Sequence, residues 1–142
     1  MARTRAASSS GLADSSATGG FTGANLIRIL AGGDGAHPHI HEKSAEVCYV
    51  LEGAMEILLD DRIETVGKGG FVVLPPGMPH AFAAPEDSAA EIFIYITPGV
   101  ERFEFFRLLQ RITREAEPES APEAIQDRYD ERFTRVGRRR SY

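Results

Sequence analysis

Seven short apolar runs, separated by turn residues, constrain the fold of this chain more than any other feature. They cover residues 26–30, 46–51, 54–59, 62–66, 70–74, 80–84 and 91–97. The segments between them carry residues that favour turns, such as Gly53 and Pro75-Pro76-Gly77. Short strands at regular spacing with turns between them predict an all-β antiparallel sandwich or barrel. Asp60-Asp61, between two of the runs, predicts a tight hairpin.

The segments that flank the predicted barrel, residues 21–98, have different patterns. After Met1, residues 1–20 contain one large apolar residue, Leu12, so we expect a disordered N-terminal arm. Apolar residues recur every third position from Val100 to Ile112, which predicts an amphipathic helix packed on the outside of the barrel. A second short helix is predicted at about 121–131, within a helical extension over 99–133. Residues 134–142 are predicted to be a solvated basic tail.

Net charge and composition limit the kinds of partner and the cellular location that we expect for this chain. The net charge of −5 argues against nucleic acid as the main partner, because duplex binding depends on clustered positive charge. No apolar run approaches the roughly 18 residues that span a bilayer, so we expect no membrane association. The single cysteine, Cys48, cannot form an internal disulfide, which fits a cytoplasmic location.

Three histidines and one glutamate form the most informative pattern. His39 and His41 point the same way if their segment is a strand, because side chains on a strand alternate between faces. Glu46 begins the next strand after a short turn, and His80 follows a proline-rich turn far along the chain. Three imidazoles and one carboxylate suit one divalent transition metal ion: Fe, Mn, Ni, Cu, Co or Zn. The chain offers no thiolate cluster of the kind that structural zinc sites use.

These residues resemble the two motifs of a small single-domain cupin. The first, G-x5-H-x-H-x4-E-x6-G, is matched by Gly33, His39, His41, Glu46 and Gly53. The second, G-x5-P-x-G-x2-H-x3-N, is matched by Gly69, Pro75, Gly77 and His80, whereas Ala84 replaces its final Asn. That Asn is not a metal ligand in the family, so the expected ligand set is complete.

The resemblance implies a cupin jelly-roll β-barrel that holds one metal through His39, His41, Glu46 and His80. It also implies a homodimer. In quercetin dioxygenase-like cupins the matching glutamate is a base, so Glu46 is interpreted either as a general base or as a ligand only. His37 is a candidate for a catalytic acid or base or an additional ligand, with a histidine at the rim of the barrel as the alternative.

Strand alternation also indicates which residues line the interior. Cys48 and Val50 share the face of Glu46, and Phe82 shares the face of His80, so these three side chains are predicted to line a substrate cavity. Cys48 is interpreted as a small buried hydrophobe rather than a nucleophile.

The leading functional hypothesis is a metal-dependent dioxygenase that acts on a small aromatic or polyketide-like molecule, for which an apolar interior is suited. The alternative within enzymes is a non-redox cyclase or isomerase of secondary metabolism, in which the metal acts as a Lewis acid. A metal-bearing binding module without turnover is the alternative from another class.

Overall fold

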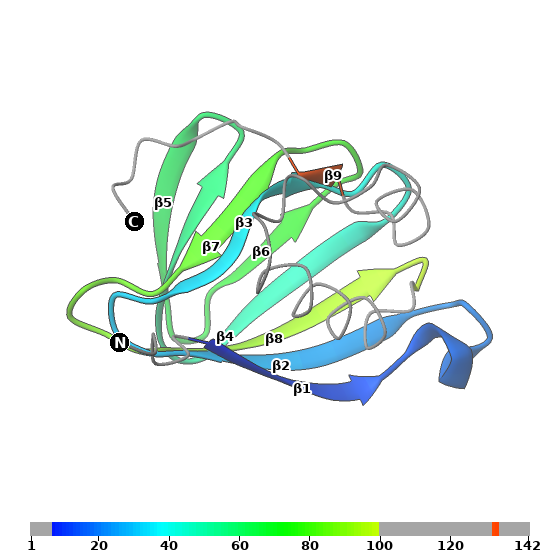
Figure 1. Ribbon diagram of the computed structural model, residues 1–142, viewed down its shortest axis with the longest axis horizontal. Helices are drawn as coiled ribbons and strands as arrows, with labels where there is room; N and C mark the ends of the chain where they lie inside the picture. The colour runs from blue at the N-terminus through cyan, green and yellow to red at the C-terminus, as the bar shows by residue number, and fades with distance from the viewer. Residues whose placement is uncertain (1–6, 100–131, 134–142) are drawn as a thin grey trace, which may run out of the picture.

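The computed structural model describes residues 7–99 and the backbone of residues 132–133. Antiparallel strands dominate this part of the chain (Figure 1). They are β1 (Ala7–Ala13), β2 (Gly23–Ile29), β3 (Asp34–Ile40), β4 (Ala45–Leu59), β5 (Arg62–Gly67), β6 (Phe71–Leu74), β7 (His80–Ala83), β8 (Ala90–Thr97) and β9 (Arg132–Phe133). A single turn of 3-10 helix, η1 (Ser15–Thr18), follows β1. No helix within the described residues is long and apolar enough to span a membrane.

Two sheets share the long strand β4. The first sheet has the order β1-β2-β8-β4-β6 and uses the N-terminal part of β4. The second sheet has the order β5-β4-β7-β3-β9 and uses the C-terminal part of β4. The sheets curl over one another in the picture (Figure 1). The predicted all-β barrel of antiparallel strands is therefore confirmed.

Gly53 lies where β4 passes from one sheet to the other. Its φ is 74°, a conformation that favours glycine. A Cβ atom at this position would lie 1.9 Å from the carbonyl oxygen of Ala89. The pairing of β4 with β8 also changes register between Val50 and Glu52. Where the sequence predicted a turn between two strands, the structure has one continuous strand that changes sheet.

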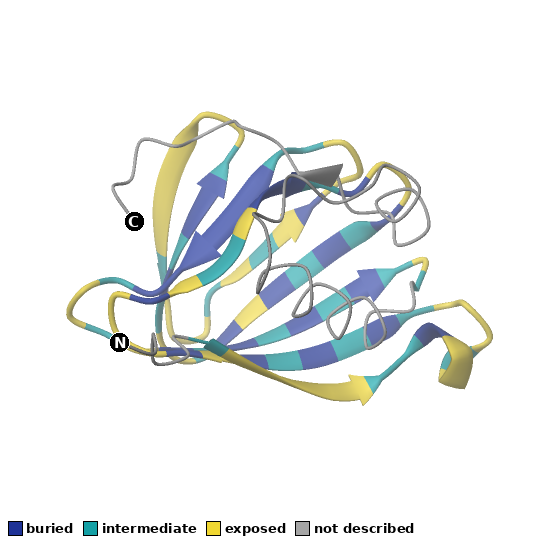
Figure 2. Ribbon diagram, in the orientation of Figure 1, coloured by how far each residue is buried: buried dark blue, intermediate teal, exposed yellow. Residues whose placement is uncertain are grey.

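The core lies between the two sheets. Burial alternates along β8, where Ala90, Ile92, Ile94 and Ile96 are buried and the residues between them are half-buried. The same alternation marks β2 and the first part of β4 (Figure 2). Because strand side chains alternate between faces, this pattern assigns one face of the first sheet to the core and the other to the outside.

The prediction of a disordered arm over residues 1–20 is wrong for its described part. Residues 7–13 form β1, which pairs with β2, and η1 follows it. Few apolar side chains do not exclude a strand here, because an edge strand is held mainly by backbone hydrogen bonds to its neighbour. Ala7 also packs against the core. The predicted helical extension over 99–133 lies outside the described residues except at its ends, and residues 132–133 form the strand β9 instead of a helix. The predicted basic tail, residues 134–142, lies wholly outside the described residues.

The hairpin predicted at Asp60-Asp61 is confirmed. Leu59 pairs with Arg62, which leaves a two-residue loop between β4 and β5. Asp60 has a φ of 58°, and the short polar side chain of Asp tolerates this left-handed conformation better than most residues do.

Candidate metal centre

Four buried side chains converge at one place inside the barrel. His39 lies on β3, His41 directly follows β3, Glu46 lies on β4 and His80 begins β7. Their ligand atoms all lie within 4.8 Å of one another. Each residue is at most 2% exposed. The four residues predicted from spacing are therefore brought together by the fold.

The pairing of β3 with β7 sets the distance between two of the rings. His39 and His80 are register partners, and their ring centroids are 4.2 Å apart. The register shifts between Ala36 and His39, where three steps along β3 oppose two steps along β7. This extra residue is a β-bulge, and bulges redirect side chains near functional sites. It also explains why His37 does not share the buried face of His39.

Backbone carbonyls fix the orientation of two rings. His39 Nδ1 lies 2.6 Å from the carbonyl oxygen of His37, and His80 Nδ1 lies 3.0 Å from that of Met78. A carbonyl oxygen only accepts hydrogen bonds, so Nδ1 carries the proton in each pair. This leaves Nε2 as the ligand atom of each ring, in the arrangement typical of metal-binding histidines.

The turn before His80 is tied to the segment that carries His41. The backbone N–H of Gly77 donates to the carbonyl oxygen of His41 over 2.7 Å. Gly77 has a φ of 83°, which few other residues adopt. The bond therefore links two ligand-bearing segments through a position that favours glycine.

Glu46 faces two of the imidazoles. Its Oε2 lies 2.8 Å from His41 Nε2 and 3.2 Å from His80 Nε2. Burial alone would raise the pKa of Glu46, but the hydrogen bonds from His41 and His80 and their charges outweigh it. The net pKa lies well below its ordinary range. Glu46 is therefore a carboxylate, and its anionic oxygen requires a positive charge beside it: a proton on a ring or a bound cation.

His39 is held in the neutral form. Burial lowers its pKa, and the charges of His80 and His41 lower it further, although Glu46 and the His37 carbonyl oppose this. A metal ligand must be deprotonated at its coordinating nitrogen. The lowered pKa of His39 therefore suits metal binding near neutral pH.

The donor set fits a first-row divalent metal. Three imidazole nitrogens and one carboxylate oxygen match the ligand preferences of several such ions, so the set does not select one of them. Four protein ligands leave a position for a further ligand when the ion takes five or six. Open positions distinguish catalytic metal sites from closed structural ones.

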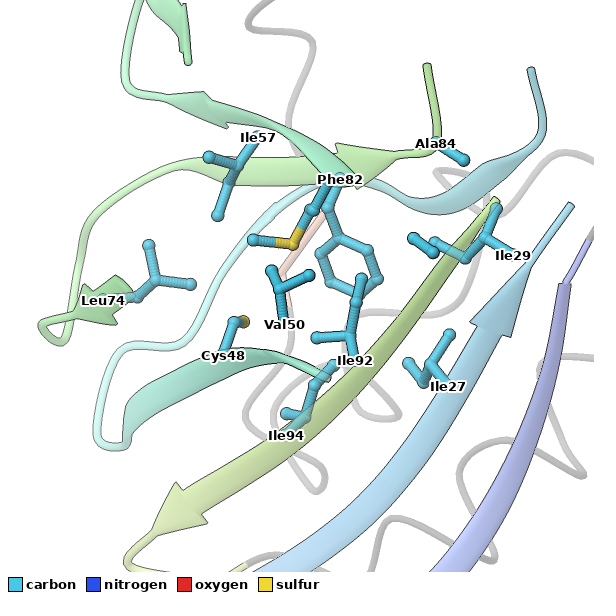
Figure 3. Packing of buried hydrophobic residues seen from close by; sticks show 12 residues of the cluster. Ile27, Ile29, Cys48, Val50, Ile57, Leu74, Phe82, Ala84, Ile92 and Ile94 are labelled. Atoms are coloured by element: carbon cyan, nitrogen blue, oxygen red, sulfur yellow. The ribbon is translucent and has the colours of Figure 1, made fainter. Parts of the chain in front are cut away.

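The three residues predicted to line a cavity point into the barrel. Cys48, Val50 and Phe82 belong to the buried hydrophobic cluster between the sheets (Figure 3). Cys48 Sγ lies 3.9 Å from Glu46 Oε1, so a weak S–H donor faces the carboxylate oxygen that does not face the rings. Ala84, at the position of the motif's Asn, is also buried in this cluster. That Cys48, Val50 and Phe82 contact a substrate stays a prediction.

The side chain of His37 lies apart from the four converging groups. It is exposed, whereas His39 is 1% exposed. The backbone carbonyl oxygen of His37, and not its side chain, contacts the ring of His39. The sequence does not predict that the carbonyls of His37 and Met78 orient the rings of His39 and His80. Pro38 is the only sequence signal of an irregular strand near the bulge. A catalytic role for the His37 side chain stays a prediction.

Comparison with known protein families shows which family this chain belongs to. Residues 25–97 match the family described as the cupin domain, which is about half of the 142 residues. The chain belongs to the cupin family. The match includes all four converging residues, so the cluster fits a cupin metal site.

Two proteins from Streptomyces are similar to this chain over more than half of its length. Protein SchB of Streptomyces halstedii is 29% identical over 109 residues, which cover 77% of this chain and 74% of SchB. Polyketide synthase CurC of Streptomyces cyaneus is 30% identical over 82 residues, which cover 58% of this chain and 51% of CurC. This cupin thus matches about half the length of CurC.

A solved structure shows the same fold. The polyketide cyclase RemF of Streptomyces resistomycificus superposes with a TM-score of 0.58 and is 23% identical. The superposition covers 72% of this cupin and 80% of RemF.

Proposed function

We propose that this cupin is a metal-dependent enzyme that cyclises a polyketide-like precursor of an aromatic product without net oxidation. The observation that carries an enzymatic role is the buried cluster of three histidines and one glutamate beside an apolar interior. The substrate class is supported by the similarity to the polyketide synthase CurC and to the polyketide cyclase RemF, whose names refer to polyketides. This proposal favours cyclisation over the dioxygenase hypothesis, because those names refer to polyketide synthesis and cyclisation.

His39, His41, Glu46 and His80 would hold the metal. When bound, it would supply Lewis acidity toward a carbonyl oxygen of the substrate. The hydrogen bonds to the His37 and Met78 carbonyls would keep two of the rings in place during the reaction.

Glu46 is the residue we assign to proton transfer. A methylene group between two carbonyls is acidic, and poly-β-ketones contain many such groups. Glu46 would accept this proton on a carboxylate oxygen, and the resulting carbanion would attack a second carbonyl carbon to form the ring bond. The alkoxide formed would then take this proton back from Glu46. Loss of the new hydroxyl group together with a proton of the adjacent carbon would release water and leave a carbon–carbon double bond. Cys48, Val50 and Phe82 would keep water away from the reacting atoms.

A dioxygenase is the second candidate. A three-histidine, one-carboxylate donor set with open positions also suits Fe(II) and oxygen chemistry. The two candidates differ in their need for oxygen, and this difference gives the test.

The test uses the full chain loaded separately with Zn and with Fe(II), and a synthetic linear poly-β-ketothioester as the probe. Cyclisation predicts a product that has lost water, formed equally well under nitrogen and in air. Products that contain added oxygen atoms, with oxygen uptake only in the Fe(II) form, would favour the dioxygenase. Binding of the probe without turnover in either form would favour a binding module.

A further inference from the structure

Asn25 is a buried polar side chain that has no part in the proposed reaction so far. It lies on β2 and is 2% exposed. On the strands that the structure describes, the other buried polar side chains are His39, Glu46 and His80, which all belong to the candidate metal centre. A buried amide is costly in apolar surroundings unless its hydrogen-bonding groups find partners. The partners of Asn25 therefore indicate what this residue does.

The Asn25 amide is held at one end by a neighbouring strand. Asn25 Nδ2 donates a hydrogen bond to Ser9 Oγ on β1 over 3.2 Å. An asparagine side chain has a second N–H donor and a carbonyl oxygen that accepts hydrogen bonds. Among the described residues, no partner faces these two remaining groups. The bond to Ser9 restricts rotation of the amide, so one donor and one acceptor are held ready for another molecule.

Strand register places Asn25 on the inner face of the first sheet. Asn25 is paired with Ile94 on β8, and Ile94 is paired with Cys48 on β4. Ile27 and Ile29, which share the face of Asn25 on β2, belong to the core cluster. Asn25 therefore lies in one inward-facing row with Cys48, whose side chain is adjacent to the candidate metal centre.

The inner face of the first sheet becomes accessible beyond Asn25, at β1. Cys48 and Ile94 are buried, whereas Ser9 is exposed although its hydroxyl faces Asn25. Gly11, which is paired with Asn25 on β1, is also exposed (Figure 2). Asn25 thus lies at the border between the apolar interior and an accessible edge of the barrel.

The position of Asn25 relative to Glu46 suits an extended substrate. Two strand spacings and two residues along β4 separate them, which is roughly 10 Å. A poly-β-ketone carries oxygen atoms at regular intervals, as ketones or as their enols. An amide suits such a group because its N–H donates to a ketone oxygen and its carbonyl oxygen accepts from an enol. A precursor that brings one methylene group to Glu46 can therefore place a more distant oxygen at Asn25.

We infer that Asn25 binds an oxygen atom of the polyketide-like precursor outside the carbons that form the ring, and so selects precursors by the position of that oxygen. This inference rests on the proposed cyclisation and adds a residue that determines its specificity. Leucine at this position has a similar size and lacks the hydrogen-bonding groups. Because the contact is made away from the reacting carbons, its loss should weaken substrate binding and leave the chemical step nearly unchanged.

The kinetic test compares the poly-β-ketothioester probe with analogues that each have a methylene group in place of one carbonyl outside the new ring. For the wild type, one analogue should have a kcat/KM about 10-fold lower than that of the full probe, the typical effect of one hydrogen bond. Asn25→Leu should raise KM for the full probe by about this factor, keep kcat nearly unchanged and no longer distinguish the two compounds. Arg28→Leu is the matched control, because Arg28 lies on the same strand but is exposed.

A second test needs no substitution at Asn25, because it is the only asparagine in the chain. Selective ¹⁵N-asparagine labelling therefore gives a single pair of side-chain amide signals in the NMR spectrum. In the Zn-loaded Glu46→Gln chain, which should turn the probe over slowly, these signals should shift on addition of the full probe. The analogue that the wild type discriminates against should shift them less. This measurement tests the inference even if Asn25→Leu does not fold, which circular dichroism shows.

The outcomes separate this inference from the proposed function. If the wild type cyclises the probe and a folded Asn25→Leu keeps the same KM and the same preference among the analogues, the inference is wrong and the proposed function stands. Asn25 amide signals that do not move at saturating probe would also overturn the inference. A wild type that neither binds nor cyclises the probe would overturn both.

Discussion

Glu46 Oε2 lies 2.8 Å from His41 Nε2, and both side chains are at most 2% exposed. A carboxylate and an imidazole so deeply buried are costly to desolvate unless a proton or a metal ion lies between them or beside them. The His80 Nε2 atom completes the arrangement at 3.2 Å from the same oxygen. Substitutions of the residues in this cluster therefore test metal binding directly.

Removing a histidine ligand should release the metal. We expect His39→Ala and His80→Ala to weaken metal binding at least about 100-fold, while the circular dichroism spectrum stays that of a β protein. The fold should persist because the core cluster does not depend on these rings. His37→Ala is the matched control, since its side chain is exposed and should leave the metal content unchanged. Full metal content in His39→Ala would show that the ligand assignment is wrong.

Glu46→Gln should separate ligand and base roles. The amide keeps one oxygen that can bind the metal, so part of the metal should remain bound. Because an amide accepts a proton poorly, turnover of the poly-β-ketothioester probe should fall by 100-fold or more, roughly the contribution of a positioned general base. The measurement is turnover per bound metal. Glu42→Gln, at an exposed position nearby, is the control. Turnover per metal equal to that of the wild type would exclude Glu46 as the base.

Gly53→Ala should destabilise the fold where β4 changes sheet. An added Cβ would lie 1.9 Å from the Ala89 carbonyl oxygen, and the φ of 74° is unfavourable for alanine. We expect a loss of about 2–4 kcal/mol in the free energy of unfolding, measured with urea. Gly67→Ala is the control, because nothing lies within 4 Å of its added Cβ. Equal stability of the two variants would contradict this account of Gly53.

The metal-free protein should lose stability in mild acid. The pKa of His39 is lower in the folded protein than in the unfolded chain, so below pH ~6.5 the unfolded chain binds more protons and stability falls as pH falls. Glu46, whose pKa is also lowered, extends the loss below pH ~4.5. The check is Tm of the metal-free protein between pH 8 and pH 5. An identical pH dependence in His39→Leu would show that His39 does not contribute.

Much of the site could be predicted from the sequence because its signals are local. The spacing of His39, His41 and Glu46 depends on strand alternation and one short turn. No local rule relates β3 to β7, so the prediction joins His80 to the other three residues through its ligand chemistry and through the resemblance to the cupin motifs. The structure supplies that relation as a register pair between His39 and His80.

Other features of the fold depend on contacts that a one-dimensional pattern does not contain. β1 forms because an edge of β2 is available to pair with it, not because its serines favour a strand. The bulge in β3 separates His37 from His39, although simple alternation places both on one face. The exposed apolar side chains of Tyr49, Phe71 and Val73 come together only when β4 and β6 are aligned, because β4 and β6 are distant in sequence.

The metal content of the untagged wild-type protein shows directly whether the four converging side chains form a metal site. The full chain would be purified without chelators and analysed by inductively coupled plasma mass spectrometry. We expect close to one divalent transition metal ion per chain, since four buried ligands converge on one position. A protein that holds no metal, even after incubation with excess Fe(II), Mn, Co, Ni, Cu or Zn, would contradict it.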